Sequence, residues 1–412
     1  MAIRKRRWTT SKGEKREGWQ LDYADQHGVR QRKSFDTKAD AVAFETTVRV
    51  EVRDGTHVAP NKDITLKDAA DIWIKAVKAG RGERPPAERS TVRQYEYHRD
   101  TYLVPMLGTV KLGQLNQARV MAFRDELLEK LSRSLAKKVL ASLKGILSEM
   151  RDRGKVVANH AAKVKIGAAT RDDDGAAEVP AIADIKAILV KLDELSEPDG
   201  TPIGLVTSKA WSRRRVLLCT AIHTGMRASE LRGLTWDAID LSKGVIHVRQ
   251  RADEWGVIGA PKSKAGRRSI PIPPALVAML RQWKVACPPS ELVFPSEEGR
   301  PQSLSNIYNR AWKPIQIAAG VCDPEKDEKG KVKLDKDGKP IMEPRHRFHD
   351  LRHFHASMLI ADGANPKEVQ VEMGHSSIQM TFDLYGSLFK DEDTERRQKA
   401  RAGRLAEKLS GT

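Results

Sequence analysis

The sequence has 412 residues, 40% of them hydrophobic, which predicts two or three domains that each bury a core. Its 73 lysine and arginine residues exceed its 55 acidic residues, and the net charge of +18 is typical of proteins that contact many phosphates, RNA-binding proteins included. Three scattered cysteines argue against a disulfide scaffold or a cysteine zinc site, and no apolar run is long enough to span a membrane, so we expect a cytoplasmic protein.

Residues 1–60 are predicted to form a small α+β module. Polar and apolar residues alternate through 19–23 and again through 29–35, around a turn at 25–28, which indicates strands. Asp36-Thr37-Lys38 then begins a helix that carries Ala41, Phe44 and Val48. The basic residues at the start are candidate DNA contacts: Arg4, Lys5, Arg6 and Arg7. The alternative is an unrelated basic β-hairpin domain.

Residues 64–167 are predicted to be an all-α domain. Apolar residues recur at helical spacing from Leu66 to Val77 and from Leu135 to Leu147, and a turn at Tyr102–Gly108 interrupts the pattern. Candidate phosphate contacts on these helices are Arg89, Arg93, Lys137 and Lys138. Most charged residues on helices are simply solvated, which is the alternative for each of them.

Residues 168–179 are small, polar and aperiodic, which predicts a linker. Residues 180–390 then alternate between helical and strand-like patterns, which predicts a mixed, mainly α domain with a short antiparallel sheet. Within it, the highly charged stretch 323–344 predicts an exposed loop or hairpin, to which no function is assigned. The tail 391–412 has helical composition.

Three motifs in the mixed domain suit the cutting of a phosphodiester. They contain Arg227, then His349 and Arg352, then His375, with Tyr385 ten residues after that histidine. Arginines match the phosphate oxygens on which negative charge develops, and a tyrosine can serve as a covalent nucleophile. The histidines can exchange a proton near neutral pH, and the scheme needs no metal.

Each motif has a simpler interpretation. Arg227 and Glu230 could form a surface helix pair. His349 and His353 could bind a metal from one helical face, but position 350 is Asp where zinc hydrolases carry Glu, and Arg352 would repel a dication. His375 and Tyr385 taken singly could be packing residues. The joint order and spacing favour the catalytic interpretation.

A lysine completes the set. Residues 261–268 lie between strand-like runs at 245–248 and 269–272, which predicts a hairpin with its turn near Ala265-Gly266. A lysine could protonate the departing oxygen, and this turn offers Lys264 and Lys262. A resemblance to the phage integrase family, whose general-acid lysine lies in such a hairpin, implies that Lys264 has this role. The other basic residues of this turn are predicted to contact DNA backbone: Lys262, Arg267 and Arg268.

These motifs resemble those of the tyrosine recombinase (phage integrase) family. The resemblance implies that Tyr385 attacks the scissile phosphate and forms a 3′-phosphotyrosyl link, with Arg227, Lys264, His349, Arg352 and His375 assisting and no cofactor required. It also implies an arm-type DNA-binding module with a three-stranded sheet in 1–60, a core-binding domain in 64–167 and a catalytic domain in 180–390. The tail 391–412 would contact a neighbouring subunit.

The expected function is therefore site-specific integration, and excision with accessory factors, of a phage or other mobile element in a bacterial host cell. The expected partners are double-stranded core and arm sites, three further subunits in a homotetramer, and an excision factor or a host DNA-bending protein. The alternatives are a chromosome-dimer resolving recombinase, a type IB topoisomerase and a catalytically silent DNA-binding protein on the same fold.

Overall fold

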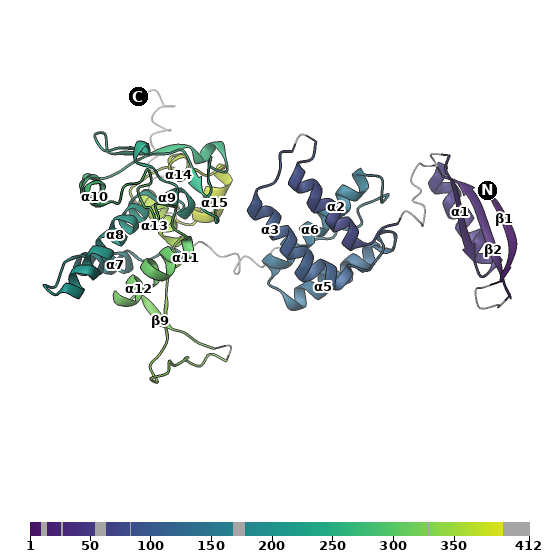
Figure 1. The fold of residues 1–412 in the computed structure, drawn as a ribbon, viewed down its shortest axis with the longest axis horizontal. Coiled ribbons are helices and arrows are strands. Elements are labelled where there is room, and N and C mark those ends of the chain that lie inside the picture. The colour runs from purple at the N-terminus through teal and green to yellow at the C-terminus, as the bar shows by residue number, and fades with distance from the viewer. Residues whose placement is uncertain are drawn as a thin grey trace, which may run out of the picture. The chain divides into compact units, whose positions relative to one another are not determined.

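The computed structural model describes residues 1–9, 15–25, 28–53, 63–82, 84–167, 178–327 and 329–389. The chain divides into two compact units, Met1–Asp174 and Gly175–Thr412 (Figure 1). Most of the predicted linker and the whole tail 391–412 lie outside the described residues. Within the described part of the chain, no helix is long and apolar enough to cross a membrane.

The first unit begins with a small sheet covered by one helix. Strands β1 (Ala2–Thr9), β2 (Lys15–Ala24) and β3 (Arg30–Phe35) form an antiparallel sheet in that order, and α1 (Lys38–Arg53) follows. Alternation along β2 turns Leu21 and Tyr23 inward, where they form a core with Val48 of α1. Thr37 begins the helix, because its hydroxyl accepts a hydrogen bond from the Asp40 amide at 3.1 Å.

A helical bundle completes this unit. Its helices are α2 (Leu66–Ala79), α3 (Arg89–His98), α4 (Val104–Leu107), α5 (Gln117–Lys130) and α6 (Arg133–Asp152). Thr65 and Asp68 cap α2 reciprocally. Trp73 packs against Gly145 of α6, where an added Cβ would lie 2.9 Å from the indole ring. The apolar stripes predicted from spacing form the core of this bundle.

The turn predicted at Tyr102–Gly108 was wrong. The chain stays helical there, passing from α3 through a π-helical turn (Arg99–Leu103) into α4. Pro105 supplies no amide donor, and the wider turn just before it lets the helical direction continue.

The second unit is mainly helical around one large core. Its larger helices are α7 (Ile182–Ser196), α8 (Pro202–Thr224), α10 (Pro274–Ala286) and α13 (Asp350–Ala361). Shorter helices are α9 (Ala228–Arg232), α11 (Leu304–Ile307), α12 (Lys313–Ala318), α14 (Pro366–Met373) and α15 (Ile378–Tyr385), with a π-helical turn, η6 (Tyr308–Trp312), between α11 and α12. Leu218 of α8, Trp312 and the strand residues Ile246 and Ile270 are fully buried in this core.

The predicted hairpin in this unit is partly right. β5 (Val245–Val248) pairs antiparallel with β8 (Arg268–Pro271), with Ile246 opposite Ile270, and β4 (Ile239–Asp240) extends the sheet. The connection is not a tight turn at Ala265-Gly266, however. It is long enough to form a second ribbon, β6 (Arg251–Ala252) with β7 (Ile258–Gly259), and a 3₁₀ turn at Lys264–Gly266 then leads into β8.

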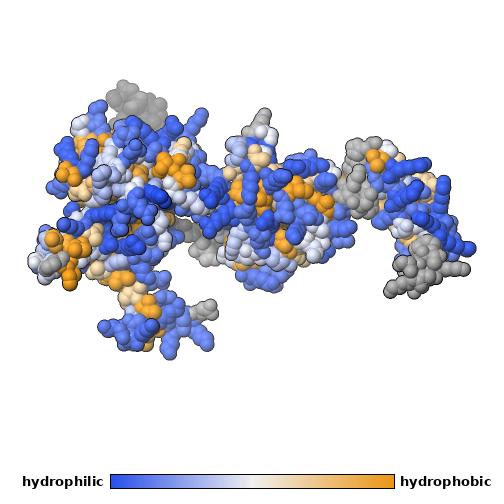
Figure 2. Space-filling view, viewed as in Figure 1, coloured by the Kyte–Doolittle hydropathy of each residue, from blue (hydrophilic) through white to orange (hydrophobic). Residues whose placement is uncertain are grey.

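The charged stretch 323–344 is the predicted hairpin. It starts with β9 (Cys322–Pro324) paired to β10 (Met342–Pro344) and extends away from the rest of the second unit (Figure 1). Two turns shape its outer part, because Asp327 and Asp335 each accept two backbone amide hydrogen bonds at 2.8–2.9 Å. Its surface is predominantly hydrophilic (Figure 2).

Candidate active site

Arg227 enters the site from the end of a buried helix. α8 stops at Gly225, whose φ of 56° is the left-handed conformation that favours glycine. An added Cβ at Gly225 would lie 2.8 Å from the His355 ring, so space as well as backbone conformation requires glycine. The chain then becomes extended at Arg227, which directly precedes α9.

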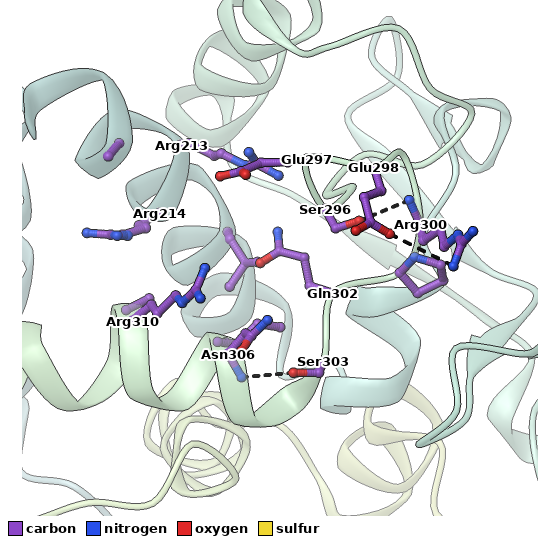
Figure 3. Close-up of a pocket in the computed structure, with 15 residues that line it drawn as sticks. Arg213, Arg214, Ser296, Glu297, Glu298, Arg300, Gln302, Ser303, Asn306 and Arg310 are labelled. Atoms are coloured by element: carbon purple, nitrogen blue, oxygen red, sulfur yellow. Dashed lines mark hydrogen bonds and ion pairs between the residues drawn. The ribbon is translucent and has the colours of Figure 1, made fainter. Parts of the chain in front are cut away.

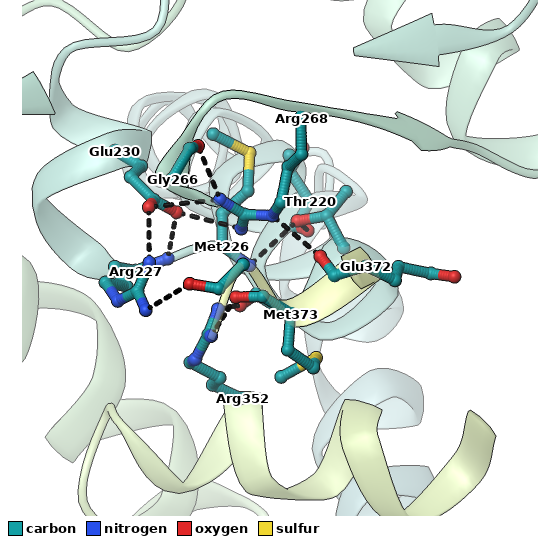
Figure 4. Close-up of polar contacts among 12 residues, drawn as sticks. Thr220, Met226, Arg227, Glu230, Gly266, Arg268, Arg352, Glu372 and Met373 are labelled. Carbon is teal, nitrogen blue, oxygen red and sulfur yellow. Dashed lines mark hydrogen bonds and ion pairs between the residues drawn. The ribbon is translucent and has the colours of Figure 1, made fainter. Parts of the chain in front are cut away.

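Glu230 fixes the Arg227 side chain. The guanidinium donates to the Glu230 carboxylate at 2.8 Å and to the Gly374 carbonyl at 3.0 Å (Figure 4). Glu230 is only 2% exposed, so this is not the surface pair of the simpler interpretation. Burial opposes its ionisation, but hydrogen bonds and charges from Arg268 and Arg227 hold the pKa of Glu230 below its ordinary value.

Arg268 lies inside the protein, which corrects its prediction as a DNA backbone contact. Its side chain is 3% exposed and donates to Glu230 at 3.0 Å and to the Glu372 carbonyl at 2.6 Å. Alternation along β8 explains this placement: Arg268 and Ile270 face the core while Ser269 faces solvent. Arg268 therefore supports the site from behind.

Arg352 lies beside Arg227 in the same cluster. Its guanidinium donates to the carbonyls of Gly225, at 2.7 Å, and Met373. Burial, together with the charges of Arg227 and Arg268, lowers the pKa of Arg352 to about 9, so it remains a cation at neutral pH. Backbone carbonyls and one carboxylate hold these two cations side by side, and arginine guanidinium groups match the oxygens of a phosphate.

His349 and His375 are the two histidines predicted from the motifs. His349 directly precedes α13 and keeps some solvent access, while its ring packs edge-to-face on His353 with centroids 5.1 Å apart. His375 is 1% exposed, and its Nδ1 lies 2.9 Å from the Thr381 hydroxyl. Desolvation and the nearby cationic groups lower the pKa of each histidine to about 4. Both rings are therefore neutral at pH 7.

Tyr385 is fully buried at the end of α15. Its ring stacks on that of His375, with centroids 6.2 Å apart and planes 17° from parallel. Its hydroxyl lies 2.8 Å from Nδ1 of His353. Burial raises the pKa of Tyr385 to about 12, although the charge of Arg352 opposes the shift. His353 was considered at the sequence level only as a metal ligand, yet it is the residue that contacts the nucleophile candidate.

Residues 205–392 match the profile of the phage integrase family. Prophage integrase IntR of Escherichia coli K12 is 29% identical over 186 residues, which cover 42% of this chain and 43% of that protein. A "Tyrosine recombinase XerC-like" protein of Caldanaerobacter subterraneus is 25% identical over 90% of this chain and 91% of its own length. Residues 205–392 are thus similar to the phage integrase family, and the relatives include a protein described as a tyrosine recombinase.

Two solved structures share the fold of this chain. The Tn1549 transposon integrase in complex with transposon right end DNA aligns over 83% of this chain and 100% of its own, with a TM-score of 0.60 and 20% identity. A lambda integrase dimer bound to a COC′ core site aligns over 94% and 95%, with a TM-score of 0.54 and 17% identity. The predicted fold, mainly helical domains with small antiparallel sheets, is confirmed.

Lys264 lies in the turn that approaches His375. The next residue, Ala265, has its carbonyl oxygen 2.8 Å from the position that a Cβ on Gly374 would take. Lys264 itself is exposed, and so is Lys262. The 3₁₀ turn thus runs beside the Gly374-His375 segment, and the choice between the two lysines stays a prediction.

The remaining predicted DNA contacts are exposed. In the helical bundle and the 264–268 turn they are Arg89, Arg93, Lys137, Lys138 and Arg267. In the N-terminal sheet, strand alternation places Arg4 and Arg6 on the face opposite α1, because Ile3, paired with Leu21, faces the helix. Lys5 and Arg7 lie on the helix side, and both form ion pairs with Glu17.

An arginine-lined hollow of about 530 Å³ lies elsewhere in the second unit, between α8 and the start of α11 (Figure 3). Arg214 stacks on Trp211 with its guanidinium carbon 4.7 Å from the ring centroid, and Arg310 faces the same space. Neither has a carboxylate partner within the described ranges. Desolvation and the charges of Arg310 and Arg213 lower the pKa of Arg214. Sequence inspection missed this cluster, because its members come from separate segments.

Proposed function

We propose that this protein cuts and rejoins DNA at specific sites, through a covalent link to Tyr385, to integrate a phage or other mobile element. One observation carries the proposal: Arg227 and Arg352 hydrogen-bond to neighbouring carbonyls of 373–374, directly before His375, which stacks on Tyr385. The family, and relatives described as integrases, support the same conclusion.

The chemistry follows from the side chains. Arg227 and Arg352 bind the non-bridging oxygens of the scissile phosphate and stabilise the charge that develops on them. The Tyr385 oxygen attacks phosphorus, the bond between phosphorus and the 5′ oxygen breaks, and Lys264 protonates that oxygen. The reverse reaction with a partner strand restores the phosphodiester and frees the tyrosine. The energy of the bond is kept in the protein link, so no nucleotide cofactor is consumed.

The buried position of Tyr385 implies a conformational step. A side chain that is 0% exposed cannot reach a phosphate in solution unless α15 moves or the site opens. A bound phosphate would raise the pKa values of the histidines. Its negative charge favours the protonated rings, whereas desolvation disfavours them. DNA binding and assembly of the site are thus coupled in this proposal.

Several surfaces support DNA as the partner. Arg4 and Arg6 lie on the open face of the N-terminal sheet, and the guanidinium groups of Arg214 and Arg310 line the hollow in the second unit, which Glu297 and Glu298 also line. We assign arm sites to residues 1–60, core sites to 64–167 and catalysis to 180–390. Solved lambda integrases form a dimer on a core site and a tetramer on a Holliday junction, which supports a homotetramer here, with the tail 391–412 between subunits. An excision factor or a DNA-bending protein would control direction.

The nucleophile assignment is tested with Tyr385→Phe. On a suicide substrate, which traps the cleaved state, we expect the wild-type protein to form a covalent adduct and the variant to form none. DNA affinity should change little, because the phenol hydroxyl contacts His353 and is hidden from solvent. The adduct is measured by denaturing gel electrophoresis and affinity by a gel-shift titration. An undiminished adduct in the variant would exclude Tyr385 as the nucleophile.

A further inference from the structure

His353 is the polar partner of the nucleophile candidate. It lies on α13, one residue after Arg352, and is 7% exposed. Its Nδ1 is 2.8 Å from the Tyr385 hydroxyl oxygen, with ring centroids 5.7 Å apart and planes at 62°. This distance suits a hydrogen bond between the imidazole nitrogen and the phenol.

The other two histidines of the motifs make different contacts. His375 stacks face to face on the tyrosine, and its Nδ1 contacts Thr381. His349 contacts the His353 ring edge-to-face. Throughout the described ranges, His353 makes the only side-chain hydrogen bond to the Tyr385 hydroxyl.

We propose that His353 is a catalytic residue that orients the Tyr385 hydroxyl and accepts its proton at Nδ1 during attack on the phosphate. As the bond between the tyrosine oxygen and phosphorus forms, the O–H bond breaks and the proton moves to His353. When the 5′ hydroxyl of a partner strand later attacks the phosphotyrosine, His353 returns the proton to the departing phenolate. The inference rests on the proposed function and adds a proton acceptor to it.

The surroundings of His353 suit this role. Desolvation and the charges of Arg352 and Arg347 lower its pKa, while Asp350 opposes the shift. The ring is therefore neutral at pH 7 and keeps a lone pair on one nitrogen. For Nδ1 to accept the phenol proton, the proton of the neutral ring must lie on Nε2. A buried phenol is too weak an acid to lose its proton first, so transfer accompanies attack.

The variant that separates the two functions of this residue is His353→Asn. An asparagine amide can occupy nearly the position of Nδ1 and keep a hydrogen bond, but it cannot take up a proton. We expect cleavage of a suicide substrate to slow by about 10²–10⁴-fold, the usual contribution of general acid–base catalysis. His247→Gln, on a ring that hydrogen-bonds Ser269 on the sheet surface, should leave the rate unchanged.

Fluorinated tyrosines at position 385 distinguish proton transfer from a structural role. They ionise more readily, so the rate of His353→Asn should rise as the phenol pKa falls, while the wild-type rate changes much less. Equal responses in the two proteins would overturn the proposal. A 5′-bridging phosphorothiolate substrate, whose leaving group needs no proton, should rescue Lys264→Ala and not His353→Asn; rescue of both would also overturn it.

These outcomes are separable from failure of the proposed function. If Tyr385→Phe still forms the adduct, the recombinase mechanism itself is wrong. If wild type forms the adduct through Tyr385 and His353→Asn cleaves at full rate, only the role of His353 is wrong. Thermal unfolding of His353→Asn, compared with wild type, shows whether a slow variant is folded.

Discussion

Glu230 shows how one residue organises the site. Its carboxylate binds Arg227, which faces the proposed phosphate, and Arg268, which is buried behind it. Taking a carboxylate and two guanidinium groups out of water is costly, and the hydrogen bonds among them offset that cost only while the set is complete. The main effect of this arrangement is therefore to fix the position of Arg227, and its contribution to the free energy of unfolding is small.

The buried histidine His375 predicts a pH dependence of stability. Its pKa falls from 6.5 to about 4 on folding, so the unfolded chain binds more protons between these values. The free energy of unfolding should consequently decrease as pH falls from about 6.5 towards 4, by up to about 3 kcal/mol from this residue. Urea unfolding at several pH values measures it, and His375→Gln should flatten the curve. An unchanged slope in that variant would contradict the shift.

Sequence patterns located these candidate catalytic residues but not their partners. Arg227, Arg352 and Tyr385 stand in recognisable motifs, whereas the inward orientation of Arg268 depends on the register of β8. The contact between His353 and Tyr385 depends on how α15 packs against α13, which no local pattern determines. The spacing of His349 and His353 indicated a shared helical face. That His353 contacts the Tyr385 hydroxyl could be seen only in the structure.

At the scale of elements, short connections between helices position the arginine cluster of Arg227, Arg268 and Arg352. α8 ends at Gly225 and α14 at Gly374, both left-handed glycines that turn the chain abruptly beside the arginines. Apolar spacing predicted the helices and the pairing of β5 with β8. It could not predict the extra ribbon β6–β7, because two-residue strands carry too little pattern.

Gly225→Ala tests the turn that delivers Arg227. The left-handed backbone would be strained, and the new methyl group would meet the His355 ring at 2.8 Å. We expect the free energy of unfolding to drop by about 1–3 kcal/mol, and cleavage to slow by about 10²-fold if Arg227 shifts by an ångström. Gly363→Ala is the matched control, because Gly363 also has a positive φ but open space around it. Similar loss of activity in both variants would show that backbone strain alone matters.

At the scale of the whole molecule, the described residues form separate cores, which allow separate functions. The N-terminal sheet packs around Leu21, Tyr23 and Val48, the bundle around its own apolar stripes, and the second unit around the core of α8. Since no core depends on residues of another, losing one module should leave the others folded. The exposed hairpin at 323–344 also stands outside these cores, so its contribution to stability should be small.

Removal of residues 1–62 tests the division of labour among the modules. The truncated protein keeps the helical bundle and the complete catalytic cluster, so it should form the covalent adduct on a simple core site at close to the full rate. It should lose integration that depends on distal arm sites, because Arg4 and Arg6 and the sheet that presents them are gone.

Arg4→Ala with Arg6→Ala in the full chain is the matched variant, and Lys5→Ala with Arg7→Ala, on the opposite face, is its control. Adduct yield on the core site and integration on a plasmid carrying arm sites are measured side by side. Equal loss in both assays would mean that the sheet module supports the catalytic part structurally and does not bind a second DNA site.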